Sequence, residues 1–308
     1  MPDVTPAAVI AFAESAPGPP VPRTRAAGSR GTARDRLRDP AAIAAALTLA
    51  AIALAAVFAP FLAPYDPAQT LDVVSRAQPP SAAHLLGTDP LSRDLLSRLL
   101  HGARVSLGIS MVAVAVATLV GTAWGAVAGY FGGAADRILM SLVDAGLAIP
   151  RILLLLGVVA FWGTLSVTAI VLLLGLTGWF GSSRLVRAAV LSTRDRDFSV
   201  AARALGAAPL RVLVRHVLPH ALAPMLVAAT LGVGQVIVLE AGLSFLGYGV
   251  APPTASWGSL IRDGREVLAT AWWVSVFPGA ALAATTLAIN VLGDRLRGAL
   301  GARQLPAP

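Results

Sequence analysis

The sequence predicts an all-α integral membrane protein with six transmembrane helices, and three observations support this fold class. Of the 308 residues, 56% are hydrophobic and 13% are charged, whereas about 25% of the residues of a soluble domain are charged. Apolar runs of about 20 residues, the length that an α-helix needs to cross the hydrocarbon core, recur along the chain. Most arginines and prolines lie in the segments between these runs.

The apolar runs place the six helices. Residues 1–40 are rich in Ala, Pro, Gly and Arg, and we expect them to be a disordered basic tail. The first helix follows at about 41–62, and this stretch is longer than the apolar part of a signal peptide. Small residues in the second helix, as in GTAWGAVAG (121–129), would let helix backbones approach closely in lipid. The other five helices are expected at about 105–130, 138–161 (interrupted by Pro150 and Arg151), 165–180, 222–245 and 272–292.

The distribution of arginines predicts the orientation of the chain. Six arginines precede the first helix, one lies in the 131–137 turn, seven lie in 182–220 and three lie in the C-terminal tail, whereas the other connections carry six. Because cytoplasmic loops are enriched in Lys and Arg, both termini and the 182–220 segment are expected in the cytoplasm. The same effect explains the net charge of +8 without any nucleic acid partner.

The segments 65–103 and 246–271 would then lie outside the membrane. Their tryptophans suit an aromatic belt at the membrane interface: Trp257, Trp272 and Trp273.

The composition excludes several kinds of chemistry. The chain has no cysteine, which excludes disulfides, cysteine-ligated zinc and a cysteine nucleophile. It has no lysine and so cannot build a P-loop, whose lysine reaches the phosphates of ATP. We expect no cofactor on this chain, and any ATP and Mg²⁺ used would be bound by partner subunits. No G-x-S-x-G motif indicates a hydrolase, and an intramembrane enzyme has no motif to support it.

Residues 200–220, VAARALGAAPLRVLVRHVLPH, predict an amphipathic helical hairpin. Asp197 or Ser199 would cap a helix from about 200 to 205, and Gly206 would end it. Pro209 would begin the second helix, and Pro219 would break it before the fifth transmembrane helix.

An apolar stripe is expected along the second helix of this hairpin, beside Arg211 and Arg215: Leu210, Leu213, Val214 and Val217. Such a hairpin could lie on the lipid surface, pack beneath its own bundle or dock into a groove on a partner. The residues alone leave these three alternatives open.

Two histidines of the hairpin, His216 and His220, have the i, i+4 spacing of a zinc pair. They lack the glutamate of an H-E-x-x-H motif, no acidic residue is near, and Pro219 lies between them. We therefore expect no metal site there.

Three charged residues fall inside predicted transmembrane helices, and such residues indicate functional sites because they are costly in lipid. Glu240 would face protein or water, either in a structural hydrogen bond to neighbouring helices or along a transport pathway. Asp144 and Arg151 are seven residues apart, two turns on one face of the third helix. They could pair with each other or with a second membrane subunit.

A set of motifs occurs in a fixed order along residues 40–298. They are LGTDPLSRDLLSRLLHGARVSL (86–107), AGYFGG (128–133), VDAGLAIP (143–150), AARALG with RHVLP (201–219), LEAGLSFLGYGVAPPTASWG (239–258), FPG (277–279) and NVLGDRLR (290–297). Together they resemble the permease subunits of binding-protein-dependent ABC importers of the dipeptide, oligopeptide and nickel family. The 86–107 block is similar to that of the C-type subunit.

The resemblance implies a division of the chain into a tail at 1–40, a first helix with an extracytoplasmic segment at 41–103, a permease domain at 104–298 and a C-terminal tail at 299–308. It implies partners as well: a second, homologous permease subunit, two ATPase subunits and an extracytoplasmic solute-binding protein that contacts the outer segments. The imported solute would be a dipeptide, an oligopeptide, nickel or a similar small solute.

The resemblance also selects docking among the three uses of the hairpin, because this loop couples the permease to the ATPase in that family. Its sequence departs from the family at Val200, where a glutamate is usual, and at His220, where an asparagine is usual. Ser92 replaces a usual glycine, and Gly301, Ala302 and Arg303 replace a usual Asp-Pro-Arg. The residues that the resemblance assigns to coupling are Val200, Ala201, Ala202, Arg203, Gly206, Arg211, Arg215 and Pro219.

The alternative is a secondary transporter or channel that works without an ATPase. Such proteins often contain inverted repeats and broken helices in matching halves. No convincing internal repeat is visible in this sequence.

Overall fold

A computed structural model describes residues 39–70, 75–163 and 165–301, and the predicted basic tail lies outside these residues. Within the described residues, the regular secondary structure is helical apart from an isolated bridge between Thr88 and Asp94. Five of its helices are long and apolar enough to cross a membrane, and a bent pair of helices raises the number to six if the pair counts as one crossing. The predicted all-α membrane fold is confirmed.

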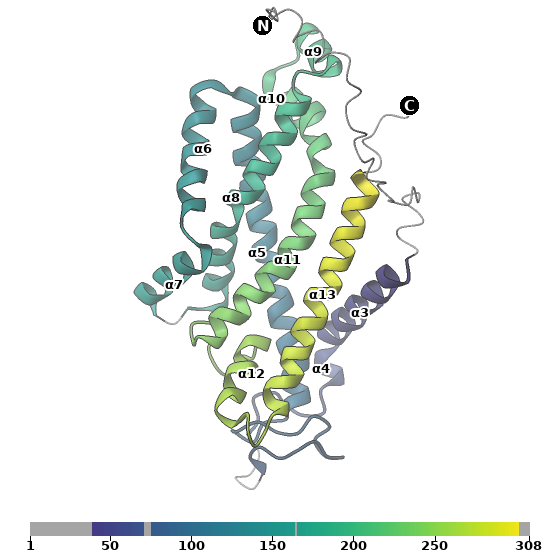
Figure 1. The fold of residues 1–308 in the computed structure, drawn as a ribbon, viewed down its shortest axis with the longest axis vertical. Helices are drawn as coiled ribbons and strands as arrows, with labels where there is room; N and C mark the ends of the chain where they lie inside the picture. Colours follow the sequence, from purple (N-terminus) through teal and green to yellow (C-terminus); the bar gives the residue numbers. More distant parts are fainter. Residues whose placement is uncertain (1–38, 71–74, 164, 302–308) are drawn as a thin grey trace, which may run out of the picture. The chain divides into compact units, whose positions relative to one another are not determined.

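The first transmembrane helix is α3, Pro40–Val57, and a short helix α4, Ala59–Leu62, continues it. Asp39 caps α3 by accepting a hydrogen bond from the Ala41 amide at 2.9 Å, and Pro40 occupies the first helical position. Asp39 also pairs with Arg295 at 2.6 Å. Helix α3 packs against α13 and α5 (Figure 1).

Helix α5, Leu95–Phe131, begins ten residues before the predicted start at 105. Asp94 caps it through the Ser97 amide at 2.8 Å. The first turns carry Arg98 and His101, which suggested a polar loop, but Arg98 is buried because acidic side chains from elsewhere neutralise it.

The predicted third helix is two helices. Helix α6, Gly133–Ala148, and helix α7, Arg151–Trp162, meet at Pro150 with a bend of 82°. Proline cannot donate to the helical ladder and its ring crowds the preceding turn, so the interruption predicted at this position becomes a sharp change of direction. Asp144 and Arg151 are therefore not on one helical face.

Helix α8, Val167–Thr193, is longer than the predicted 165–180 and packs along α5 more extensively than any other pair of helices. Three α5 glycines four residues apart, Gly121, Gly125 and Gly129, face α8. A Cβ added at Gly121 would lie 2.7 Å from Ser182 Cβ, and one at Gly129 would lie 3.0 Å from the Arg187 carbonyl. The predicted close approach of small residues is confirmed at this interface.

After α8 the chain forms α9, Asp197–Ala204, and α10, Pro209–Val212. A π-helical turn, Leu213–Val217, and a 3₁₀ turn, Leu218–Ala221, lead into α11, Leu222–Phe245. Helix α12, Trp257–Gly264, is followed by a 3₁₀ turn, Arg265–Val267, and by the last helix, α13, Trp273–Gly301. Helix α9 and helix α12 lie at opposite ends of the bundle (Figure 1), and we call these the α9 end and the α12 end.

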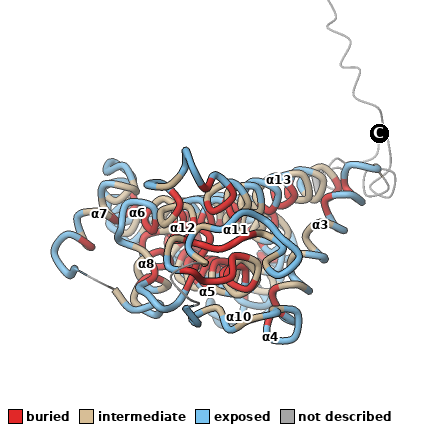
Figure 2. Tube along the Cα trace, turned by 90° about the horizontal axis from the view of Figure 1, so that it is seen from below, coloured by how far each residue is buried: buried red, intermediate tan, exposed pale blue. Residues whose placement is uncertain are grey.

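Buried residues concentrate on α5, α11 and α12 in the middle of the bundle, with exposed residues around them (Figure 2). At the α12 end the core includes two of the tryptophans predicted for an interfacial belt. Trp257 and Trp273 are 1% and 6% exposed, whereas Trp272 is half exposed. The belt prediction was therefore wrong for Trp257 and Trp273, because their indole N–H groups reach the carbonyls of Leu99 and Thr88 inside the protein.

Candidate functional site

The first arm of the predicted hairpin is α9, which begins at Asp197, before the predicted start. Arg196 occupies the cap position without a side-chain hydrogen bond, so neither Asp197 nor Ser199 caps the helix as predicted. The Ser199 hydroxyl instead donates to the Thr193 carbonyl at 3.2 Å, which joins α9 to the end of α8.

Gly206 ends the first arm with a left-handed backbone, φ +80°. The Gly206 amide donates to the Arg203 carbonyl at 2.9 Å, and the Ala207 amide donates to the Ala202 carbonyl at 3.1 Å. These two bonds form a Schellman motif, in which a glycine commonly takes the left-handed position. The predicted role of Gly206 as a helix terminator is confirmed.

Arginines attach the base of the hairpin to the rest of the α9 end. Arg194, just after α8, donates to the Gly129 carbonyl of α5 at 2.9 Å and pairs with Asp195 at 3.0 Å. Arg203 of α9 donates to the Arg194 carbonyl at 3.2 Å and lies 3.6 Å from Asp195. The hairpin is therefore connected to the ends of both α5 and α8.

The second arm begins at Pro209 as predicted, but its buried face differs from the predicted stripe. Val212, Leu213 and Val217 are buried against apolar residues of α5 and α8, whereas Leu210 and Val214 are 66% and 55% exposed. The hydrogen bonds of a π-helical turn join residues five apart rather than four. The side chains that share one face of the arm therefore differ from those that the α-helical spacing predicted.

Pro219 does not break this arm. It occupies an early position of the 3₁₀ turn Leu218–Ala221, and the chain runs on into α11 without leaving helical geometry. The prediction of a break was wrong because the π and 3₁₀ turns redistribute the hydrogen bonds around a residue that has no N–H to donate.

The residues predicted for coupling come together at the α9 end. Seven of them are exposed, Ala202 is partly buried, and neither Arg211 nor Arg215 forms an ion pair among the described residues. Large apolar side chains are exposed beside them, and Leu205, next to Gly206, is 88% exposed. His220 stacks on Phe198 with ring centroids 5.1 Å apart, which places it against α9. The hairpin thus combines a buried base with an apolar and basic outer surface.

Glu240 lies at the junction of α5, α11 and α12 and is fully buried. Its carboxylate accepts hydrogen bonds from the hydroxyls of Ser106 on α5, at 3.1 Å, and Ser244 on α11, at 2.7 Å. The Ser106 oxygen also accepts the Trp257 amide at 3.1 Å. The geometry is that of a structural hydrogen-bond centre between helices.

Asp144 and Arg151 have separate partners. Asp144 of α6 pairs with Arg184 of α8 on the exterior. Arg151 donates to the Leu174 carbonyl of α8 at 2.6 Å and lies 3.5 Å from the Thr177 hydroxyl. The local pairing of Asp144 with Arg151, one of the two alternatives that their spacing left open, does not occur, because the bend at Pro150 separates their helices.

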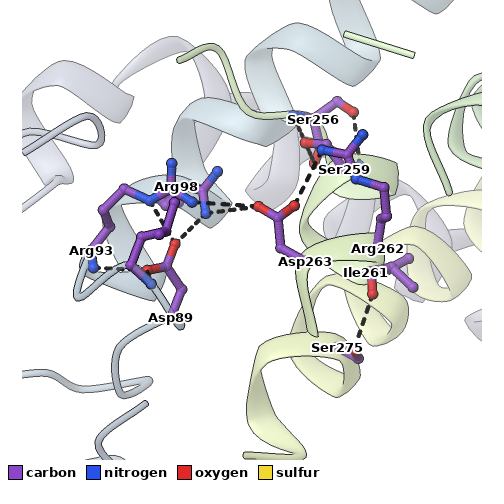
Figure 3. A network of polar contacts seen from close by, with 10 residues as sticks. Asp89, Arg93, Arg98, Ser256, Ser259, Ile261, Arg262, Asp263 and Ser275 are labelled. Atoms are coloured by element: carbon purple, nitrogen blue, oxygen red, sulfur yellow. Dashed lines mark hydrogen bonds and ion pairs between the residues drawn. The ribbon is translucent and has the colours of Figure 1, made fainter. Parts of the chain in front are cut away.

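A second polar centre, at the α12 end, was not predicted (Figure 3). Asp89 is fully buried, accepts from Arg93 Nε at 2.7 Å and pairs with Arg98. Asp263 of α12 lies 3.2 Å from Arg98 and 3.4 Å from Arg93. These four side chains fasten the loop before α5 to α12. The 86–107 motif contained three of them, but only the fold brings Asp263 to that site.

The chain is similar to known proteins along most of its length. The family described as binding-protein-dependent transport system inner membrane component matches residues 121–305, and the N-terminal transmembrane domain of oligopeptide transport permease C matches residues 32–80. A putative peptide transport system permease protein of Brucella abortus is 40% identical over 88% of this chain and 91% of its own length. A di/tripeptide transport system permease protein of Pseudomonas aeruginosa is 41% identical over 84% and 87%.

Two further comparisons agree with this relationship. A glutathione transport system permease protein of Pectobacterium atrosepticum is 38% identical over 86% of this chain and 87% of its own length. A chain of the MetNI methionine ABC transporter, solved in an inward-facing conformation, shares the fold with a TM-score of 0.54 and 22% identity, over 66% of this chain and 96% of that one. The chain therefore belongs to the family of binding-protein-dependent transport system inner membrane components, as a permease subunit of an ABC importer of the C type.

Proposed function

We propose that this permease imports di- or oligopeptides and that its α9–α10 hairpin, residues 197–221, transmits the movement of a separate ATPase subunit. The observation that carries the proposal is the contrast between the two sides of the hairpin. Its base is buried against α5 and α8, whereas its tip exposes Leu205 and Leu210. An exposed amphipathic helix of this kind suits the groove of a partner protein.

A coupling element must be both exposed and firmly attached. Val212 and Val217 are buried at the base of the hairpin, and Arg194 joins its start to α5. A push on the tip therefore acts on the transmembrane helices rather than on a loose loop. ATP hydrolysis would belong to two partner ATPase subunits, which bind ATP and Mg²⁺.

The orientation follows from the same proposal. The hairpin and the residues just before it carry five of the seven arginines of 182–220, and the α9 end would face the cytoplasm with both termini, in agreement with the enrichment of Arg in cytoplasmic loops. The α12 end would face outward in the inner membrane of a prokaryotic cell and receive an extracytoplasmic solute-binding protein. A second, homologous permease subunit would complete the pathway.

The substrate class rests on the relatives. Those named above are peptide, di/tripeptide and glutathione permeases. We propose that the cargo is a short peptide.

The test is co-purification of an ATPase subunit with the full transporter from detergent. Leu205→Asp and Leu210→Asp place charges on the proposed docking surface and should abolish both co-purification and uptake, while the protein still inserts in the membrane. Leu85→Asp is the matched control for ATPase co-purification, because Leu85 is 62% exposed outside the candidate transmembrane helices and away from the hairpin. Normal ATPase association of Leu205→Asp would contradict the coupling role, and transport that survives complete ATP depletion would contradict the importer itself.

A further inference from the structure

We propose that Arg151 is the centre of an anion-binding transit site, which contacts a carboxylate of the solute as it crosses the membrane. This inference rests on the proposed function, since it assumes that a solute passes through the permease. It assigns the polar side chains between α7, α8, α11 and α13 to that passage.

The first observation is a positive charge without a negative partner. Arg151 begins α7 in the bent pair of apolar helices, and among the described residues no carboxylate lies within ion-pair distance of its guanidinium. Its contacts are the Leu174 carbonyl and the Thr177 hydroxyl, which use only part of its five N–H donors. A charge held at membrane depth faces protein or a water-filled cavity and commonly marks a substrate or ion pathway.

The second observation is that Arg151 lines two cavities. One has a volume of about 270 Å³ and the other about 390 Å³, and Gln235 of α11 also lines both. Among the described residues, no aspartate or glutamate lines either cavity. The smaller one contains a second arginine, Arg297, which lies 4.0 Å from Asp294. The space around Arg151 is therefore positive in character.

The third observation is a set of polar groups without partners at the same place. Thr286 of α13 lines the larger cavity, and its buried hydroxyl has no hydrogen-bond partner in the described structure. Gln235 and Asn290 also line this cavity, and their side chains are exposed. Polar groups without partners are costly in lipid. The presence of these polar groups is explained if water and a polar solute pass along this surface.

Acidic side chains of the membrane region are placed elsewhere. Glu240 is fully buried by its serine partners, and Asp144 is paired with Arg184. Neither lines the two cavities. This arrangement leaves the Arg151 guanidinium available to a carboxylate, which its planar fork of donors can bind through two parallel hydrogen bonds. A peptide supplies such a group at its C-terminus.

The charge of the site can be measured without knowing the solute, because the chain contains no cysteine. Val238 lines the larger cavity beside Arg151 and is 48% exposed, so Val238→Cys gives a single reactive thiol there. Its rate of modification by an anionic methanethiosulfonate should exceed that by a cationic one, relative to a Leu85→Cys reference outside the membrane. Arg151→Gln should lower this ratio severalfold, whereas Arg151→Lys and Arg184→Gln should preserve it. A ratio that Arg151→Gln leaves unchanged would overturn the proposal.

The second measurement is uptake of a labelled dipeptide by the complete transporter in vesicles. Arg151→Gln should reduce uptake severalfold, with Arg151→Lys retaining most of it, while ATPase co-purification stays normal in both. That normal co-purification separates a failure here from a failure of the coupling proposal. Uptake by Arg151→Gln equal to that of the original protein would refute the transit site.

Discussion

The Ser106 hydroxyl of α5 donates a hydrogen bond to Glu240 on α11 at 3.1 Å, across 134 residues of sequence. The same oxygen accepts the first amide of α12, that of Trp257, at 3.1 Å. Two side chains thus hold three helices at one point in the core. A group with this many buried partners is expensive to remove, because each partner loses its own hydrogen bond.

Glu240→Ala should therefore destabilise the protein, by about 1–3 kcal/mol for each hydroxyl left buried without a partner. Glu240→Gln retains an oxygen acceptor and a similar volume and should lose much less. Thermal unfolding of the detergent-solubilised protein measures the difference. Equal midpoints for the two variants would show that the serine hydrogen bonds contribute nothing.

Asp89→Ala should be more damaging, because it leaves Arg93 and Arg98 buried with only the more distant Asp263 to compensate them. Breaking a buried ion pair by removing one partner costs about 3–5 kcal/mol. We expect little folded protein in detergent from this variant. The control is Asp66→Ala, since within the part of the chain that the structure describes the Asp66 side chain bonds only the nearby Ala68 amide on an exposed turn.

Gly125→Leu should separate α5 from α8, because a side chain there would collide with the backbone of Ser183. Overpacking of this kind costs about 1–3 kcal/mol, and more where backbone is in the way. Gly108→Leu is the control on the same helix, since nothing lies within 4 Å of a Cβ at Gly108. A comparable fall in melting temperature for both variants would argue against close helix contact as the cause.

Asp136 and Arg187 form a two-pronged ion pair, with both N···O distances 2.6 Å, between α6 and α8. A double-mutant cycle with Asp136→Asn and Arg187→Gln should give a coupling energy of about 1 kcal/mol, since bidentate geometry favours the pair and partial exposure weakens it. High salt should reduce this coupling. Additive effects of the two substitutions would mean that the pair does not hold α6 to α8.

The sequence predicted the bounds of a helix correctly where the polar residues lie at its ends. It predicted them wrongly where the helix continues through polar residues. Helix α11 was predicted at its observed bounds. Helix α5 was predicted to begin ten residues late, because Arg98 is neutralised by Asp89 and Asp263, which no local pattern connects to it. Helix α8 was predicted too short for the same reason, since Arg187 finds its partner on α6.

The hairpin shows the same division. Gly206 and Pro209 have roles set by their own backbones, and both were predicted correctly. The buried face of the second arm depends on a π-helical turn, which has no reliable residue pattern, so Leu210 was assigned to the wrong side. The two cavities beside Arg151, and their electrostatic character, depend on side chains from five helices together. The sequence therefore identified Arg151 as a candidate site residue but did not predict the cavities beside it.

Helix α5 runs unbroken for 37 residues, a length of about 55 Å at 1.5 Å per residue. Its first turn belongs to the Asp89 and Arg98 centre, and its last turn is bonded by Arg194 beside the α9–α10 hairpin. A continuous α-helix is stiff along its axis, so a tilt imposed at one end must appear at the other. We therefore expect a displacement of the α9–α10 hairpin to reach the opposite end of the bundle along α5 itself, without any chain of side-chain rearrangements.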